Sequence, residues 1–308
     1  MAFPKLPAKA AYITLNNPNA SSLSVLRDLR QQLHHHLTSP RTGRLLTLPP
    51  FKQHILNLKP TDTNTGSNSN NYTWLTDPES WRIEREDLPN VLVLRSAGPI
   101  FSAGDDPQEP PTTTTKTIIQ ETLALRAEVT SLIRHSPAPI ITPIKTSSPV
   151  TPTGLHLSLT TDFPIALSST QFQLPAPTST RSLATSLPLM AAISRRLPPG
   201  LAYRLFALGE RVSAGQLGRA GGVLDVVAVP EHAESIDTAA RALEGRVAGV
   251  VERLAVGTAA GRLQALGKWA YWTQLGIGGG GGAGEGDDDD DGYEAAVEWA
   301  GAVMDGQL

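Results

Sequence analysis

The sequence predicts an α/β protein in which a core of alternating strands and helices is followed by a mostly helical region. Short apolar runs at residues 91–94, 139–144 and Phe163–Leu167 are typical of buried strands. A helical apolar stripe, Thr113–Arg134, separates the first two runs. Beyond residue 186 the patterns are mainly helical, which predicts that the sheet is completed before the C-terminal region begins.

The composition excludes several classes of protein and site. The 308 residues suffice for one large domain or two small ones, and 40% hydrophobic with 18% charged residues is a globular profile. Because cysteine is absent, disulfides, thiolate metal sites, cysteine nucleophiles and iron–sulfur clusters are excluded. The formal net charge of −3 includes five aspartates at 287–291, and no concentrated basic face predicts a nucleic-acid partner. No apolar run reaches the ~18 residues of a membrane-spanning helix, so no membrane span is expected.

The N-terminal part predicts a strand followed by a helix. Residues 11–15 alternate like a strand and end at turn-forming residues. Ser24 is the expected N-cap of a helix whose apolar stripe is Leu26, Leu29, Leu33 and Leu37. Residues 61–72 hold almost nothing that a core would bury, so we expect a disordered insertion at about 57–75.

The remaining elements complete the core and the helical region. We expect a tight loop at 101–106, a helix at 154–161, and further strands at 172–174 and 223–229. The core is predicted to span residues 1–255, and residues 256–308 to form the C-terminal helical region. A Gly/Asp-rich linker, 276–292, interrupts that region.

Taken in order, these segments resemble the enoyl-CoA hydratase/isomerase (crotonase) superfamily. The family's first block is a strand, Asn-Pro, a small polar stretch and a helix, as in residues 13–29. Its second block is a strand followed by F-S-A-G-x-D, which is matched by residues 101–106. Its third and fourth blocks are similar to residues 139–169 and 195–229. The F-S-A-G-x-D loop is the most specific of these elements, because it stands in register with the others.

The resemblance implies a fold, a ligand and an assembly. It implies a crotonase-like (ClpP/crotonase) spiral of ββα turns with a C-terminal α-helical oligomerisation region, assembled as a homotrimer or hexamer. Within the superfamily, the branch called enoyl-CoA hydratase domain-containing protein 3 is most similar, since Leu266-Gly267-Lys268 and Met304-Asp305 fit its C-terminal helices. The implied partner is an acyl-CoA thioester, with coenzyme A as part of the substrate, no separate cofactor and no metal.

The resemblance also places an oxyanion hole. Crotonase chemistry develops negative charge on the thioester oxygen, and losing one N–H donor to such an oxygen costs roughly 3–4 kcal/mol. The family's two backbone donors fall on Asp105 and Thr153, and its substrate-binding positions on Ser102, Ala103, Gly104, Asp106 and Gly154. Two departures stand out: Asp105 brings a carboxylate near the oxyanion, and Pro152 stiffens a turn that the family builds from glycines.

The family's acid–base pair is degenerate in this sequence. Counting from Asp162 and Phe172, its two glutamates fall on His156 and Ala176. Alanine transfers no proton, so the two-glutamate hydration mechanism is not available, and His156 is the only candidate base. The alternative is that His156 is a buried, hydrogen-bonded helix residue. Asp106 and Asp162 match family positions, where capping or turn roles are expected.

Other motifs favour structural roles. Residues His34, His35 and His36 point in different directions on a helix, so a solvated face is preferred to a metal site. The segment containing Lys268, Trp269, Tyr271 and Trp272 either closes the acyl pocket and builds the oligomer, as in the family, or is a core stripe with an exposed lysine.

Two functional hypotheses remain from the sequence. The first is an enzyme that acts on an acyl-CoA thioester through the oxyanion hole with His156 as base. The second is a non-catalytic acyl-CoA-binding or scaffold protein with the same fold. The first 27 residues contain no Asp or Glu, a weak sign of an organellar leader, so both mitochondrion and cytoplasm are expected locations.

Overall fold

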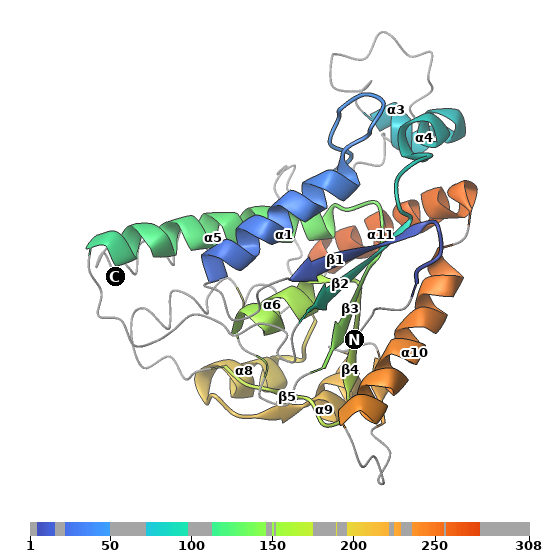
Figure 1. The fold of residues 1–308 in the computed structure, drawn as a ribbon. Helices are drawn as coiled ribbons and strands as arrows, with labels where there is room; N and C mark the ends of the chain where they lie inside the picture. Colours follow the sequence, from blue (N-terminus) through green and yellow to red (C-terminus); the bar gives the residue numbers. More distant parts are fainter. Residues whose placement is uncertain are drawn as a thin grey trace.

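The computed structural model describes residues 5–15, 22–49, 72–97, 113–145, 150, 152–174, 189, 196–221, 225–228, 236–255 and 257–277. These residues form a parallel sheet with helices on both faces (Figure 1). Predictions that fall on other residues lie outside the described part of the chain.

The main sheet has five strands, and every neighbouring pair is parallel. Across the sheet the order is β1 (Ala10–Leu15), β2 (Val91–Ser96), β3 (Ile140–Ile144), β4 (Phe163–Leu167) and β7 (Asp225–Val227). A second, two-stranded antiparallel sheet pairs β5 (Gln171–Phe172) with β6 (Val212–Ser213). The expected strands are therefore confirmed, with ends shifted by a few residues.

The described helices are α1 (Ser22–Leu37), α3 (Thr73–Thr76), α4 (Pro78–Arg85), α5 (Thr113–Arg134), α6 (Pro152–Thr160), α8 (Pro199–Ala207), α9 (Ala214–Arg219), α10 (Ile236–Leu254) and α11 (Thr258–Ile277). Helices α1 and α5 cover one face of the sheet, and α10 covers the other (Figure 1). None of the helices in the described ranges is long and apolar enough to cross a bilayer.

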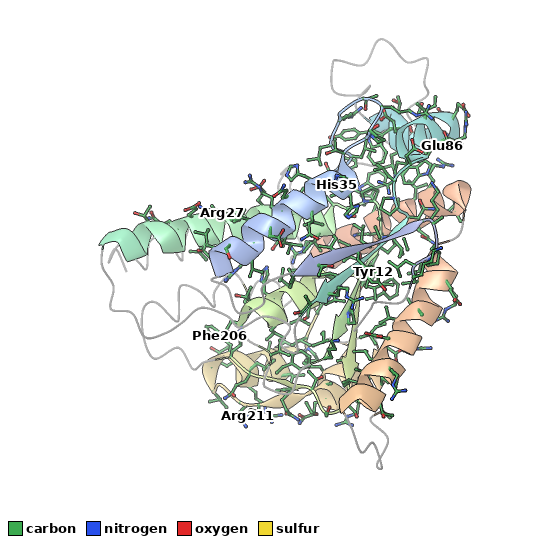
Figure 2. The ribbon with its side chains drawn as sticks, viewed as in Figure 1. Tyr12, Arg27, His35, Glu86, Phe206 and Arg211 are labelled. Atoms are coloured by element: carbon green, nitrogen blue, oxygen red, sulfur yellow. The ribbon has the colours of Figure 1, made fainter. Side chains whose placement is uncertain are left out.

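The two sheet faces follow from the alternation of side chains along each strand. On β2, Leu92 and Leu94 pack into a cluster with α1 and α5, whereas Val91 and Val93 pack against α10. Figure 2 shows Arg27 on the outer side of α1, while Tyr12 of β1 lies on the sheet face that α10 covers. Strand β2 is thus buried on both faces, which explains its apolar run.

Three expectations about element ends were wrong. Helix α1 begins at Ser22, so Ser24 lies inside the helix and is not its N-cap. The end of the predicted disordered insertion, residues 72–75, includes part of α3, where Trp74 and Leu75 are buried. These apolar side chains join a cluster under α4 and α11, which anchors the segment. Helix α11 extends to Ile277, two residues into the predicted linker.

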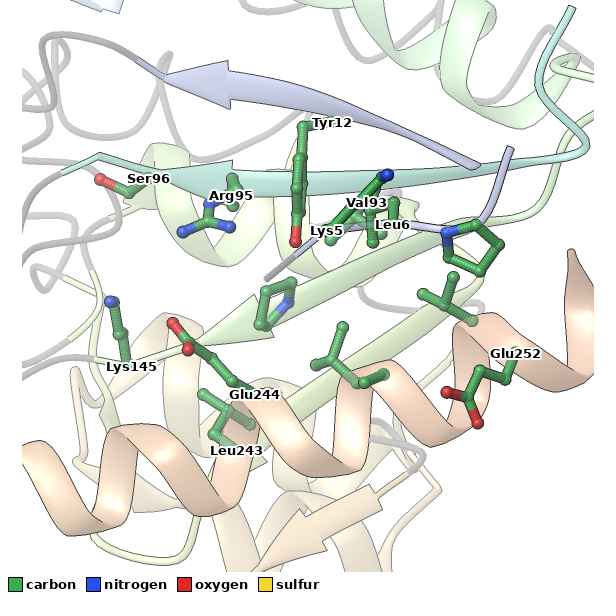
Figure 3. Close-up of a pocket in the computed structure, with 15 residues that line it drawn as sticks. Lys5, Leu6, Tyr12, Val93, Arg95, Ser96, Lys145, Leu243, Glu244 and Glu252 are labelled. Carbon is green, nitrogen blue, oxygen red and sulfur yellow. The ribbon is translucent and has the colours of Figure 1, made fainter. Parts of the chain in front are cut away.

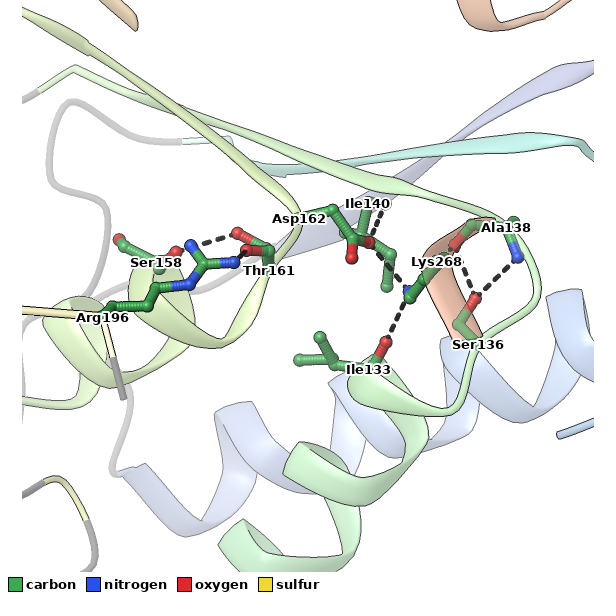
Figure 4. Close-up of polar contacts among 9 residues, drawn as sticks. All are labelled: Ile133, Ser136, Ala138, Ile140, Ser158, Thr161, Asp162, Arg196 and Lys268. Carbon is green, nitrogen blue, oxygen red and sulfur yellow. Dashed lines mark hydrogen bonds and ion pairs between the residues drawn. The ribbon is translucent and has the colours of Figure 1, made fainter. Parts of the chain in front are cut away.

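A buried ion pair fixes α11 to the sheet (Figure 4). The Lys268 ammonium lies 2.8 Å from the Asp162 carboxylate and donates to the Ile133 carbonyl at 2.9 Å. Asp162 also accepts a hydrogen bond from the Ile140 N–H at 2.7 Å, at the start of β3. The expectation of an exposed lysine is wrong, because the Lys268 side chain is only 4% exposed.

The surroundings of the pair shift the pKa of Lys268. Burial lowers the pKa of Lys268, and the Asp162 carboxylate opposes this shift. Asp162 lies in the turn between α6 and β4. It is the acceptor that joins β3, the turn before β4 and α11.

Replacing Lys268 by methionine leaves the Asp162 carboxylate buried beside an apolar chain. We expect Lys268→Met to lower the free energy of unfolding by about 3–5 kcal/mol, and Lys268→Met with Asp162→Asn to recover part of that loss. Arg246→Met is the matched control, because the Arg246–Asp225 pair is exposed and contributes about 0–1 kcal/mol. Urea unfolding gives the free energy of unfolding of the unaltered protein and of the three variants. Equal stability of Lys268→Met and the unaltered protein would contradict the role of the pair.

Close packing between α11 and the turn before β2 provides a second test. A Cβ at Gly261 would lie 2.6 Å from the buried Asn90 side chain, whereas a Cβ at Gly267 of the same helix meets nothing within 4 Å. We expect Gly261→Ala to cost about 1–3 kcal/mol and Gly267→Ala to stabilise by up to about 1 kcal/mol. Urea unfolding followed by tryptophan fluorescence measures the stability of both variants. If Gly261→Ala is as stable as the unaltered protein, the contact between α11 and Asn90 is not tightly packed.

Candidate functional site

The candidate site lies at the start of α6, at the carboxyl edge of the sheet. Strand β3 ends at Ile144, and α6 begins at Pro152 and returns to the opposite edge, where β4 starts. In parallel α/β sheets, ligands bind at the carboxyl ends of the strands. The start of a helix also carries partial positive charge and outward-pointing N–H groups. The predicted residues Thr153, Gly154 and His156 all lie on this helix.

The imidazole of His156 is held by α5. Its Nε2 atom lies 2.7 Å from the Thr130 hydroxyl, which itself donates to the Arg126 carbonyl at 2.7 Å. A hydroxyl has one proton to donate, so this pattern assigns the proton on the ring to Nε2 and the lone pair to Nδ1. The ring is therefore oriented as a neutral imidazole whose possible proton acceptor is Nδ1.

The surroundings of His156 disfavour its charged form. The residue is 1% exposed, and burial lowers its pKa well below the ordinary value. The positive charges of Arg126 and Arg134 lower the pKa further. His156 is consequently neutral at pH 7, which leaves it able to accept a proton but makes it a weak base.

Thr153 and Gly154 form the first turn of α6 next to this imidazole. Thr153 is buried, and its hydroxyl accepts a hydrogen bond from the Arg126 guanidinium at 3.3 Å. The Gly154 carbonyl accepts from the Ser158 hydroxyl at 2.6 Å. Pro152 is the first helical residue, a position at which a missing N–H costs little and the fixed φ suits the helix. Pro152 thus helps to start α6.

The structure brings together only part of the predicted site. It places Thr153, Gly154 and His156 on one helix, and Asp162 in the ion pair described above. Outside the described residues lie Ser102, Ala103, Gly104, Asp105, Asp106 and Ala176. Within the described ranges, no group of three His, Asp or Glu side chains could hold a metal ion.

Sequence reasoning missed the contribution of α5. Arg126, Thr130 and Arg134 are buried and recur every fourth residue, so they lie on one face of that helix. The recurrence of these three polar residues at four-residue spacing was the available signal. It places two cations and a hydroxyl around His156 and Thr153.

Comparisons with known proteins agree with this architecture. No family model matches the sequence. The chain is 28% identical over 192 residues to the mitochondrial enoyl-CoA hydratase domain-containing protein 3 of Rattus norvegicus, covering 62% of this chain and 58% of that protein. The Mus musculus protein of the same name is 30% identical over 155 residues, covering 50% of this chain and 49% of that protein. The matches thus span roughly half of these relatives' length.

The solved structures that are similar share the fold. Human enoyl-CoA hydratase domain-containing protein 3 aligns with a TM-score of 0.56 at 19% identity, covering 98% of this chain and 92% of that chain. This chain has the crotonase fold. A putative enoyl-CoA hydratase from Mycobacterium avium paratuberculosis aligns with a TM-score of 0.57 at 18% identity, covering 96% and 86% of the two chains. The β3–α6–β4 unit is therefore part of a crotonase fold.

The buried imidazole of this crotonase-fold chain predicts a pH dependence of stability. The unfolded chain takes up a proton at His156 as the pH falls below about 6.5, whereas the folded chain, with its lowered pKa, does not. The free energy of unfolding should therefore decrease as the pH is lowered below about 6.5. The contribution of His156 to this decrease is at most about 1.4 kcal/mol per pH unit.

Urea unfolding at pH 7.5 and 5.5 tests this dependence. His156→Gln removes the titrating group, so its stability should fall less between these pH values than that of the unaltered protein. His35→Gln, at an exposed position of α1, is the control for replacing a histidine by glutamine outside the core. If His156→Gln is as acid-sensitive as the unaltered protein, the buried imidazole is not the cause.

Proposed function

We propose that this chain binds an acyl-CoA thioester at the start of α6 and polarises its carbonyl with the backbone N–H groups of Thr153 and Asp105. The observation that carries this proposal is the first turn of α6, which lies at the carboxyl edge of the sheet beside a neutral, oriented imidazole. The proposed substrate-binding residues are Ser102, Ala103, Gly104, Asp106 and Gly154. The names of the similar proteins, which include enoyl-CoA hydratases, support the choice of ligand.

In the enzymatic form of the proposal, His156 is the only base. Nδ1 accepts a proton from the carbon beside the thioester carbonyl, and the electron pair moves onto the carbonyl oxygen to give an enolate. The two N–H groups stabilise that oxygen. Return of the proton to a different carbon gives a double-bond isomer, so the step needs no second acid. Ala176 supplies none, and hydration by two carboxylates is not part of the proposal.

A second candidate is a non-catalytic acyl-CoA-binding or scaffold protein. The burial of His156 favours it, because a 1% exposed imidazole between two arginines is a weak base with little contact to a ligand. In this form the Thr130–His156 hydrogen bond only joins α5 to α6. The two candidates agree on binding and differ on turnover.

Calorimetric titration with butyryl-CoA and palmitoyl-CoA, followed by turnover assays with the matching enoyl-CoA, tests both. We expect saturable binding of an acyl-CoA that is at least tenfold tighter than binding of free coenzyme A. If the chain is an enzyme, His156→Gln loses turnover by a factor of about 10²–10⁴ with its dissociation constant little changed, and His35→Gln behaves like the unaltered protein.

The results of the binding and turnover assays distinguish the two candidate functions. Binding without turnover in the unaltered protein selects the non-catalytic candidate. Turnover that survives in His156→Gln removes His156 from the mechanism. Absence of binding of either acyl-CoA to a protein with a cooperative unfolding transition overturns the proposal as a whole.

We place the proposed activity in the mitochondrion, with the cytoplasm as the alternative, because the similar rat and mouse proteins are named as mitochondrial. We also propose a homotrimer or hexamer, by analogy with the superfamily. Half-exposed Tyr271 and exposed Leu263 on α11 are available for such contacts. Light scattering on the purified protein measures the mass of the assembly.

A further inference from the structure

A cavity of about 70 Å³ lies between the sheet and α10 (Figure 3). It is on the opposite sheet face from α5, since the Val93 side chain lines it and Leu94 packs toward α5. Most of its wall is apolar, formed by Val93, Pro143, Leu243, Val247, Ala248 and Val251. The candidate site at α6 does not include this cavity.

Charged groups gather at one end of the cavity. Arg95 of β2, Lys145 after β3 and Glu244 of α10 lie together there, and the Tyr12 hydroxyl points toward them (Figure 3). The guanidinium of Arg95 stacks over the Tyr12 ring, with its central carbon 4.6 Å from the ring centroid. Over the whole lining, Lys5, Arg95 and Lys145 stand against Glu244 and Glu252, which leaves one excess positive charge.

Among the cations that line the cavity, Lys145 is a partly buried one with capacity for a ligand. The structure gives it no hydrogen bond or ion pair with another described residue, although the side chain is partly buried. Arg95 adds a second positive charge at this end of the cavity, where it already interacts with Tyr12 and is attracted by the charge of Glu244. Burial lowers the pKa of Arg95, and the charge of Glu244 opposes this shift.

We propose that this cavity binds a short-chain monocarboxylate. The carboxylate pairs with Lys145 and Arg95, and the hydrocarbon chain lies along the apolar wall of α10 and the sheet. A water-sized group occupies about 10–15 Å³ by this measure, so the cavity of about 70 Å³ holds roughly five to seven such groups. This is the size of a four-carbon acid such as butyrate. A multiply charged phosphate fits less well, because the wall is apolar and Glu244 repels it.

Ligand-observed NMR with butyrate tests the proposal, with 1-butanol and inorganic phosphate as competing chemistries. We expect saturable binding of butyrate, and binding of butanol and phosphate at least tenfold weaker. Lys145→Met should weaken butyrate binding at least tenfold. Ala248→Phe, which fills the cavity, should abolish it, and Arg246→Met on the outer side of the same helix should leave it unchanged.

Several results would overturn the proposal. The first is failure of butyrate to bind the unaltered protein. The second is butanol binding as tightly as butyrate, and the third is Lys145→Met binding butyrate as tightly as the unaltered protein does. Calorimetry with butyryl-CoA on Ala248→Phe keeps this site separate from the one at α6. If butyryl-CoA still binds that variant while butyrate does not, two sites exist; if butyrate also still binds, it occupies another place and the cavity is not its site.

Discussion

The buried ion pair between Lys268 and Asp162 is the contact on which the arrangement of the core depends. A charge in the interior is tolerated only when its partners are complete, so α11 has to lie where Lys268 reaches Asp162 and the Ile133 carbonyl. The same carboxylate receives the Ile140 N–H, which fixes the start of β3. One side chain thereby holds α11, β3 and the turn before β4 together, although they are far apart in sequence.

The turn that contains Asp162 also positions α6, on which the candidate site lies. The helix is held at its end by the turn at Asp162, where Arg196 also donates to the Thr161 carbonyl (Figure 4). It is held from the side by the hydrogen bond between His156 and Thr130. With both contacts made, the first turn of α6 is directed to the carboxyl edge of the sheet. The position of the backbone N–H groups that we propose as ligand donors is therefore set by the contacts of Arg196 and His156 with neighbouring elements.

The sequence predicted the sheet and its covering helices well, because strands buried on both faces require continuous apolar runs. Helix α1 was predictable for the same kind of reason, since four leucines recur at helical spacing. Burial of single polar residues was not predictable. Helical spacing cannot tell whether a lone lysine such as Lys268 finds a carboxylate 106 residues away. Nor could it show that the Thr130 hydroxyl orients His156, because that contact joins two helices.

In the function proposed for this chain, backbone N–H groups at the start of α6 polarise a thioester carbonyl. Infrared difference spectroscopy with butyryl-CoA carrying ¹³C at the carbonyl tests it most directly, because a hydrogen-bonded carbonyl absorbs at lower wavenumber than a free one. We expect the labelled band to move to lower wavenumber on binding. The His156→Gln variant, which leaves the backbone donors in place, should retain most of that shift. A bound thioester whose carbonyl band stays at its position in water would contradict the account.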